Sequence, residues 1–390
     1  MHLTLHLTKD CNLRCTYCFA APFTRHAMSQ AVGERALEFG AELGNGECNV
    51  IFFGGEPLLC KERIRALIAH ARQLEAASAN GAGDDGKPTR RRFSFRISTN
   101  GTLLDDETLA YFMRENVHVA LSIDGCREAH DTHRRTTGGE GTFDTVVERL
   151  AALLAVRPYS PVQMVVRPDT VKYVTQSVEF LLDEGVRYLL MSLDYTADWT
   201  EAHMRVLERE YRKLARRYIR WTEAGRKFYF SPFEQKLASH IHNGCTRTDR
   251  CEMARQQLSV DIDGNIFPCV QFPNAGADSE YCLGSIFTGL KSQRRHELQG
   301  CADGVKESCK GCALTDRCTH TCGCLNWKTT GDVNTVSPVV CHHEQMLMPI
   351  ADRVGEILYK RRNPLFLHKH YNPGYPILSA IEDVLEARRK

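Results

Sequence analysis

The cysteines of this chain fall into two dense groups, and their placement limits the possible folds more than any other feature. The 390 residues include 17 cysteines, of which three lie between Cys11 and Cys18 and eleven between Cys245 and Cys341. Disulfides are rare in reducing compartments, and scattered core thiols would not cluster in this way. The two groups therefore predict metal or catalytic centres, one near the N-terminus and one in the second half of the chain.

Composition argues against several classes of protein. The formal net charge of +2 offers no attraction to nucleic acid or to an anionic membrane surface. No apolar run approaches the roughly 20 residues that a membrane span needs. The first residues, Met1–His6, lack the basic start and apolar core of a signal peptide. Apolar residues make up 43% of the chain, enough for a real core. We therefore expect a globular cytoplasmic protein with no nucleic-acid or membrane partner.

Strand-like and helical patterns alternate through the first half of the chain, which is typical of βα units with a parallel sheet. Six such units would form a partial, TIM-like (β/α)6 barrel that is open on one side, so the predicted fold class is α/β. A segment rich in Gly, Asp and basic residues, Ser78–Arg92, predicts a surface loop. The β-rich runs are Leu3–Leu7, Asn49–Phe53, Phe93–Ser98, Val117–Ser122, Val162–Val166 and Tyr188–Ser192, and the helical patterns include Ala31–Gly40, Arg63–Glu75 and Thr145–Ala155.

The pattern changes in the second half of the chain. A charged segment with spaced apolar residues, His203–Arg226, predicts a helix with one solvated face. Beyond about Ser231 the regular periodicity fades and cysteines dominate. The sequence thus predicts a barrel over residues 1–230, a cysteine-rich domain over 231–345 and a C-terminal helical extension over 346–390.

The first cysteine group, Cys11-Asn-Leu-Arg-Cys15-Thr-Tyr-Cys18, follows the first predicted strand directly. Three thiolates at this spacing can hold one face of a cubic iron–sulfur cluster and leave one iron without a protein ligand, where a small molecule can bind by an amine and a carboxylate. A loop at the carboxyl end of a barrel strand faces the usual active-site mouth. A zinc knuckle is the alternative, but structural zinc takes four ligands and no fourth lies nearby at tight spacing.

With Tyr17 before its third cysteine, this CxxxCxxC motif resembles the signature of the radical S-adenosylmethionine (radical SAM) superfamily. Further motifs resemble those of the family at the ends of the next three strands, and each taken alone would be a turn, a cap or a surface residue. By this likeness the GGEP motif holds the SAM amino group, Ser122 and Arg134 hold the SAM carboxylate, and Asp124 lies near the ribose. The motifs are Gly54-Gly55-Glu56-Pro57, Ser98-Thr99-Asn100-Gly101-Thr102, Ser122-Ile123-Asp124-Gly125 and His130-Asp131-Thr132-His133-Arg134. The residues implied in SAM binding are Tyr17, Gly54, Gly55, Glu56, Pro57, Ser98, Asn100, Ser122, Asp124 and Arg134.

The second cysteine group resembles the SPASM extension of radical SAM enzymes. The resemblance implies two auxiliary four-iron clusters, and eight thiolates satisfy two such clusters. A pair of zinc ribbons is the structural alternative. The matching pattern is Cys251-x12-Gly264-x4-Cys269, then Cys309-x2-Cys312-x5-Cys318-x3-Cys322, then Cys341.

The implied ligands divide into two sets of four. Some relatives leave an iron open at the position of Cys245, and Cys301 and Cys324 lie close enough to take its place. The remaining cysteines, Cys48, Cys60, Cys126 and Cys282, have no motif around them and are expected to be plain thiols. The first set is Cys245, Cys251, Cys269 and Cys322, and the second is Cys309, Cys312, Cys318 and Cys341.

The resemblance implies three [4Fe-4S] clusters and S-adenosylmethionine as cofactors. The cluster at the first motif would reduce bound SAM, and the 5′-deoxyadenosyl radical would take hydrogen from the substrate. SPASM enzymes mostly modify peptides or proteins, so we expect a ribosomally made precursor peptide as substrate and a flavodoxin or ferredoxin as electron donor. The segment Val260–Phe272 looks most like peptide maturases that form a cysteine thioether. The likeness assigns no catalytic side chain.

Two other reactions stay open, formylglycine formation as in anaerobic sulfatase maturases and a carbon–carbon crosslink. Sulfatase maturases carry an aspartate, proposed as the base, just after the cysteine that corresponds to Cys269. This chain has Val270 there, which cannot take a proton.

Leader recognition is expected from a separate protein or from other parts of this chain. Thioether-forming maturases often begin with a leader-binding winged-helix module, whereas the cysteine motif begins here at residue 11. A non-enzymatic zinc- or cluster-binding interaction protein is the competing hypothesis of another class. Iron and sulfide content would separate the two.

Overall fold

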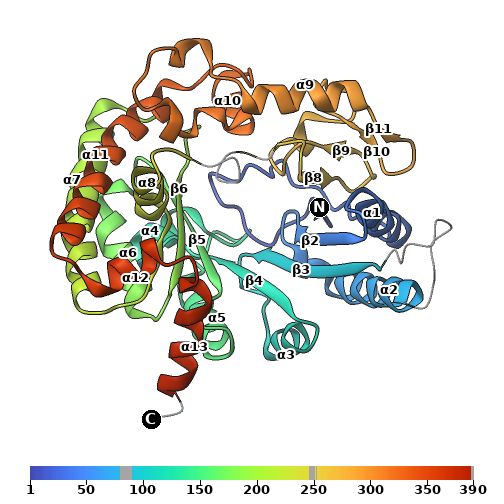
Figure 1. The fold of residues 1–390 in the computed structure, drawn as a ribbon. Coiled ribbons are helices and arrows are strands. Elements are labelled where there is room, and N and C mark those ends of the chain that lie inside the picture. Colours follow the sequence, from blue (N-terminus) through green and yellow to red (C-terminus); the bar gives the residue numbers. More distant parts are fainter. Residues whose placement is uncertain (80–89, 246–250, 252, 388–390) are drawn as a thin grey trace.

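The computed structural model describes residues 1–79, 90–245, 251 and 253–387. One sheet of nine strands runs through the molecule in the order β7-β6-β5-β4-β3-β2-β1-β8-β9. Helices α1, α2, α3 and α5 lie along the outside of the strands, and a second, cysteine-rich layer covers one side of them (Figure 1). This arrangement confirms the predicted α/β partial barrel with a cysteine-rich part beside it.

The first seven strands of the sheet are parallel to one another. Their apolar side chains are buried, as parallel strands covered by helices require. The six predicted strands are all present, with bounds that differ by at most two residues. The strands are β1 His2–His6, β2 Glu47–Phe53, β3 Arg92–Thr99, β4 Val117–Ser122, β5 Pro161–Val166, β6 Tyr188–Leu193 and β7 Tyr229–Phe230.

Helices connect these strands, and several begin at residues suited to capping. Ser29 and Asp105 accept hydrogen bonds from the first turns of α1 and α3, which satisfies backbone donors that have no partner inside the helix. The predicted loop Ser78–Arg92 begins at the end of α2, and its residues 80–89 lie outside the described part of the chain. The helices are α1 Gln30–Leu43, α2 Lys61–Ala79, α3 Asp106–Arg114, α4 Arg127–His133, α5 Phe143–Val156, α6 Val174–Asp183, α7 Glu201–Glu223 and α8 Ser231–Ile241.

The cysteine-rich part is joined to the barrel by the sheet itself. Strand β8 pairs parallel with β1, with His2 opposite Gln257, and β9 pairs antiparallel with β8. Strand β1 therefore lies between β2 of the barrel and β8 of the cysteine-rich part. The remaining elements are β8 Gln257–Val260, β9 Ile266–Phe267, β10 Gly284–Ser285, β11 Gly289–Leu290, α9 Ser292–Asp303, α10 Gly323–Thr330, α11 Pro338–Lys360, α12 Pro364–Tyr371 and α13 Tyr375–Ala387.

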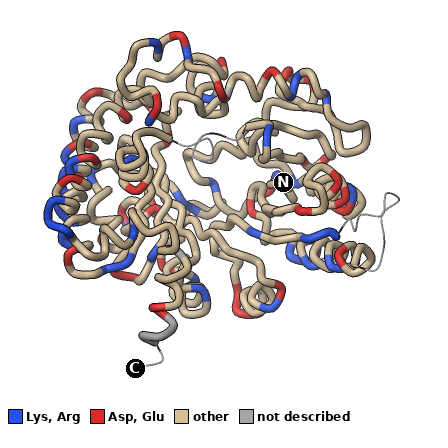
Figure 2. The backbone as a smooth tube through the Cα atoms, in the orientation of Figure 1, with Lys and Arg blue, Asp and Glu red and all other residues tan. Residues whose placement is uncertain are grey.

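Helix α11 links the cysteine-rich part back to the barrel. It begins at Pro338, includes Cys341 and packs against α7 and α8. The predicted boundary between residues 345 and 346 therefore lies inside one continuous helix. Basic and acidic residues are interspersed along the outer helices, among them α7 and α11 (Figure 2). Within the described ranges, no helix has the length and apolar character to cross a membrane.

Candidate active site

The motifs singled out in the sequence meet at the carboxyl ends of β1 to β4. The cysteine loop follows β1, the Gly-Gly-Glu-Pro turn follows β2, and the segments that begin at Ser98 and Ser122 close β3 and β4. Adjacent parallel strands end at one edge of their sheet, so motifs far apart in the sequence become neighbours here.

Two glycines let the turn after β2 press against the cysteine loop. Gly54 has φ +141°, and a Cβ on it would lie 2.4 Å from the Thr8 carbonyl oxygen. A Cβ on Gly55 would lie 2.0 Å from the Asp10 carbonyl oxygen. The Gly55 and Glu56 amides donate to these same carbonyls, each at 2.9 Å. Only glycine fits at this distance, and the turn thereby holds the loop that leads into Cys11.

The Glu56 carboxylate is buried and held by three donors. It accepts hydrogen bonds from the Leu58 amide at 2.9 Å, the Thr99 hydroxyl at 2.7 Å and the Asn100 amide at 2.8 Å. Burial raises the pKa of Glu56, while these donors and the charge of Arg134 oppose the rise. The site therefore holds an acidic group in one orientation at the mouth of the barrel.

A second buried acid, Asp124, joins the segment after β4 to the cysteine loop. It accepts hydrogen bonds from the Tyr17 hydroxyl, from Arg134 Nε at 3.0 Å and from the Val165 amide at 3.0 Å. The Arg134 guanidinium also lies over the Tyr17 ring, 5.5 Å from its centroid. Asp124 is 1% exposed and the Arg134 side chain 8% exposed, so this ion pair is shielded from water.

The thiols of Cys11, Cys15 and Cys18 are close enough that the charge on one thiolate would raise the pKa of its neighbours. Burial raises the pKa of Cys11 to about 12 and that of Cys15 to about 11, and Arg134 opposes the rise at Cys15. Iron ligation needs the thiolate, so loading a cluster here releases protons. The three thiols, beside a buried carboxylate and a buried guanidinium, are a donor set that suits a cluster with a bound amino acid.

The other residues implied in SAM binding lie in the same region. The side-chain nitrogen of Asn100, Nδ2, is 3.9 Å from the Cys11 sulfur and 3.0 Å from the Asn12 side-chain oxygen. Ser98 donates to the Gln163 side chain at 2.8 Å, and Ser122 lies opposite Gln163 in the β4–β5 register. Pro57 begins a short 3-10 helix directly after Glu56.

The cysteine-rich part brings two groups of thiols together. The sulfurs of Cys322 and Cys324 are 3.4 Å apart, and Cys324 is also within hydrogen-bonding reach of the Cys251 and Cys269 thiols. In the second group, Cys318 and Cys341 are within electrostatic range of Cys309, and Cys341 also of Cys312.

The backbone of Cys245 contacts a loop of the second group. Its amide donates to the Asp316 carbonyl at 2.8 Å, which places its backbone beside the loop between Cys312 and Cys318. Across the described ranges, no group of three or more His, Cys, Asp or Glu side chains is placed so that it could hold a single metal ion. The fit to clusters therefore rests on the donor set, which consists of thiols.

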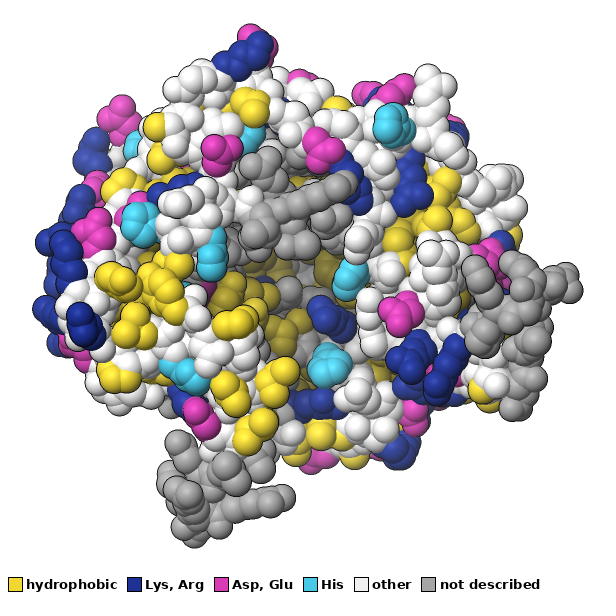
Figure 3. Space-filling model, in the orientation of Figure 1, with side chains coloured by type: hydrophobic (Ala, Val, Ile, Leu, Met, Phe, Trp, Pro, Cys, Tyr) yellow, Lys and Arg dark blue, Asp and Glu magenta, His cyan; other side chains and the backbone are white. Residues whose placement is uncertain are grey.

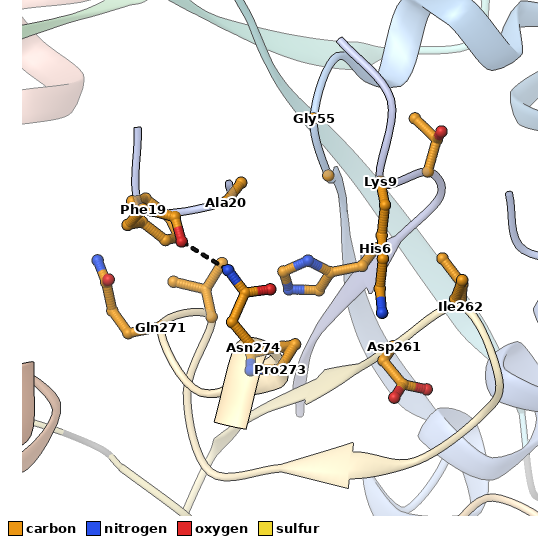
Figure 4. A pocket seen from close by; sticks show the side chains of 13 residues that line it. His6, Lys9, Phe19, Ala20, Gly55, Asp261, Ile262, Gln271, Pro273 and Asn274 are labelled. Atoms are coloured by element: carbon orange, nitrogen blue, oxygen red, sulfur yellow. Dashed lines mark hydrogen bonds between the residues drawn. The ribbon is translucent and has the colours of Figure 1, made fainter. Parts of the chain in front are cut away.

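A small cavity lies between the cysteine loop, the Gly54–Gly55 turn and the segment after β9. Its volume is about 20 Å³, room for roughly one water molecule. Asn274 spans the gap by donating to the Phe19 and Ala21 carbonyls at 2.8 and 2.9 Å (Figure 4). Figure 3 shows this face of the molecule hollowed at its centre. The lining residues are His6, Thr8, Lys9, Phe19, Ala20, Gly54, Gly55, Asp261, Ile262, Val270, Gln271, Pro273 and Asn274.

The cavity wall is apolar at Val270, and the titratable side chains that line it belong to His6, Lys9 and Asp261. Burial, with a smaller effect of Lys9, lowers the pKa of His6 to about 3, so its imidazole is neutral. The His6 Nε2 is buried and has no hydrogen-bond partner among the described residues. Asp261 closes a turn by accepting from the Asp263 and Asn265 amides at 2.9 and 2.8 Å.

Sequence reasoning missed three contributors to this region, His6, Thr99 and Asn274. A single histidine at the end of an apolar strand was the available signal for His6. Thr99 lies inside a motif that was recognised, but its contact with Glu56 depends on how β2 and β3 pair. Nothing in the local sequence around Asn274 indicates its contact with a loop more than 250 residues earlier.

Comparisons with known proteins agree with this geometry. Residues 5–181 match the sequence profile of the Radical SAM superfamily. A cysteine-type anaerobic sulfatase-maturating enzyme of Clostridium perfringens is 24% identical over 354 residues, which cover 84% of this chain and 90% of the relative. A serine-type anaerobic sulfatase-maturating enzyme of Bacteroides thetaiotaomicron is 24% identical and covers 93% of both chains.

Solved structures match over most of the chain as well. The structure described as native anSMEcpe with bound AdoMet superposes with a TM-score of 0.76 at 19% identity, covering 92% of this chain and 99% of the other. Streptococcus suis SuiB bound to precursor peptide SuiA gives a TM-score of 0.56 at 16% identity, over 87% of this chain and 75% of the other. The predicted radical SAM domain is therefore confirmed over residues 5–181, and the similarity to sulfatase-maturating enzymes indicates an enzyme.

Proposed function

We propose that this enzyme takes a hydrogen atom from a side chain of a peptide or protein and oxidises that side chain by two electrons. The observation that carries the proposal is the convergence of three thiols, the Glu56 carboxylate and the Asp124–Arg134 pair at one end of the barrel. The family implies a [4Fe-4S] cluster and SAM at this place, and bound together they supply a 5′-deoxyadenosyl radical.

The residues of the chain would bind SAM and hold it still. Glu56 would take the ammonium of SAM, because its carboxylate is already oriented by three donors. Arg134 and Ser122 would receive the carboxylate, and Asp124 would orient Arg134 as its buried partner. Groups fixed before the ligand arrives lose little freedom when it binds.

Two auxiliary clusters belong to the same proposal. The pattern of a SPASM domain assigns one cluster to the group that contains Cys251, Cys269 and Cys322, and the other to the group around Cys309. Both groups consist of thiols that the fold gathers from separate segments. These clusters would accept the electron that leaves the substrate, or bind the substrate directly.

The names of similar proteins support a peptide substrate. Several of the curated relatives are sulfatase-maturating enzymes, and three of the solved structures are described with bound peptides. A precursor peptide made by the ribosome is the substrate class that we propose. We also propose that the enzyme acts in the cytoplasm and receives electrons from a flavodoxin or ferredoxin. A separate protein would bind the leader of the peptide.

We place thioether formation first among the reactions. The cavity beside the cysteine loop presents Val270 at the position where sulfatase maturases carry the proposed base, and the carboxylate in its lining, Asp261, accepts hydrogen bonds from two amides of its own turn. A thioether needs a substrate thiolate near the carbon that loses hydrogen, and a metal-bound sulfur is already deprotonated. Formylglycine formation is the second candidate, favoured by relatives that match across 84–93% of this chain.

Mass spectrometry of a cysteine-containing peptide separates the two reactions. The reconstituted enzyme is incubated with SAM, a strong reductant and a peptide encoded beside its gene. A thioether gives a loss of about 2 Da and a cysteine that iodoacetamide no longer alkylates, since no thiolate is left to attack. Conversion of cysteine to formylglycine gives a loss of about 18 Da and an aldehyde that reacts with hydrazides, because oxygen replaces sulfur and two hydrogens are lost. Deoxyadenosine without either product would contradict both reactions.

A further inference from the structure

Four thiols of the cysteine-rich part meet at one place, and one of them lies outside the eight-cysteine pattern. Cys324 is 3.4 Å from the Cys322 sulfur and within hydrogen-bonding reach of the Cys251 and Cys269 thiols. Cys269 and Cys324 are each 8% exposed. All four thiols are free, so no disulfide explains their approach.

The backbone around Cys324 is built to bring it there. Cys322 is the residue before α10, and Gly323 and Cys324 form the first turn of that helix. A Cβ on Gly323 would lie 2.7 Å from the Cε of Met253, which is itself 1% exposed. The missing side chain lets the start of α10 press against the segment that follows Cys251. The start of α10, which carries Cys322 and Cys324, therefore packs on the Met253 side chain, two residues after Cys251.

Positive charge surrounds the thiols. Lys328 lies one turn after Cys324 on α10 and within electrostatic range of its sulfur. Lys306 lies within electrostatic range of Cys251 and is held by the Cys301 carbonyl and the Asn334 side chain, at 2.5 and 2.9 Å. Four thiolates carry a large negative charge when they bind iron, and nearby ammonium groups stabilise it.

We propose that Cys324 ligates the first auxiliary four-iron cluster and completes its set of four thiolates. The other three ligands are Cys251, Cys269 and Cys322. Each thiol gives up its proton when it binds iron, and four thiolates satisfy one cube. The assignment rests on the proposed pair of auxiliary clusters, and it makes Cys245 unnecessary for the first of them.

Anaerobic reconstitution with iron and sulfide tests this assignment on Cys324→Ala, Cys324→Ser and Cys245→Ala. The wild type is expected to hold about twelve irons in three clusters. Cys324→Ala should lose up to about a third of that iron, or keep it with a changed electron paramagnetic resonance spectrum of the first auxiliary cluster. Cys324→Ser should also change this spectrum, because oxygen replaces sulfur at the iron. Cys245→Ala should match the wild type in both measurements.

Cys282→Ala is the matched control, because Cys282 is a thiol of the same part that is 5% exposed. It should keep wild-type iron and spectra, and all variants should keep SAM binding at the first cluster. Wild-type iron and spectra in Cys324→Ala would overturn the assignment, as would equal losses in Cys324→Ala and Cys282→Ala, or zinc in place of iron. About four irons in the wild type itself would instead remove both auxiliary clusters.

Discussion

The SAM-binding end of the barrel and the cysteine-rich part hold their functional groups by different means. Around the first cluster site, Glu56 and Asp124 each accept three hydrogen bonds from neighbouring strands and loops. In the cysteine-rich part, the Cys324 thiol interacts with the thiols of Cys251, Cys269 and Cys322, and thiols are weak hydrogen-bonding groups. The side chains of the first site are thus fixed by hydrogen bonds within the protein, whereas the second, on the assignment proposed above, would rely on iron to hold its segments together.

The largest expected effect is on catalysis at the first site. Replacing Cys11, Cys15 and Cys18 together by alanine should abolish SAM cleavage and remove about four of about twelve irons, because this trio is the proposed site of the cluster that binds SAM. Deoxyadenosine assay and iron analysis measure both changes. Wild-type deoxyadenosine production by the triple variant would refute the assignment.

Breaking the buried ion pair of the hydrogen-bonded site should lower the free energy of unfolding. Asp124→Asn leaves the Arg134 charge buried without its partner, and breaking such a pair typically costs about 3–5 kcal/mol. Urea unfolding followed by circular dichroism measures the loss. Asp144→Asn removes the partner of Arg127 on the surface, where the carboxylate is 77% exposed, and should change stability little. Equal shifts in the two variants would mean that burial of the Asp124 pair contributes nothing.

A smaller loss is expected in SAM affinity. Glu56→Gln removes the charge from the proposed hydrogen bond to the SAM ammonium, a bond typically worth about 1.5–3 kcal/mol. Calorimetric titration of the reconstituted enzyme should show binding weakened by about tenfold or more. Glu62→Gln, at an acid whose side chain is 85% exposed on α2, is the control. Unchanged affinity for SAM in Glu56→Gln would mean that Glu56 shapes the turn after β2 and does not bind the SAM ammonium.

Removal of iron should affect the two regions unequally. A chelator added to the reconstituted enzyme should speed amide exchange in α10 by at least about tenfold, because its first turn would lose two cluster ligands. Amides of β3 and β4 should keep their protection in the same sample, since their hydrogen bonds involve no cysteine ligand. Hydrogen exchange with mass spectrometry compares the peptides, and equal changes in both would argue against a cluster that supports the second region.

The smallest expected effect is a pH dependence of SAM binding. Burial raises the pKa of Glu56, so its carboxylate gains a proton at a higher pH than an ordinary glutamate does. Affinity for SAM should therefore fall as the pH drops through this raised pKa and recover above it. Glu56→Gln has no such group and should remove that part of the pH profile. The same profile in both proteins would assign the dependence to another residue.

The barrel strands and the first site were readable from the sequence because their signals are local. Each parallel strand is a short apolar run, and each motif directly follows its strand, as Gly54–Pro57 follows β2. Strand order in a βα fold then places these motifs side by side. The superfamily and the fold class could be predicted for this reason.

Other features depend on contacts between distant segments. The sequence marked a cysteine-rich part near Ser231, but it contains no signal that β8 pairs with β1 or that Asn274 reaches the Phe19 carbonyl. The boundary drawn after residue 345 lies inside α11, because apolar periodicity and cysteines overlap in that helix.

The sequence by itself determined the α/β class, the radical SAM motifs and the supply of thiols, because spacing within a few residues sets each of them. Tertiary structure alone decided which thiols meet. Cys324 lies 3.4 Å from the Cys322 sulfur and interacts with two thiols from earlier segments, and Cys245 lies beside Asp316 by a backbone hydrogen bond. Spacing along a chain limits which groups can be neighbours, but packing between segments decides which of them are.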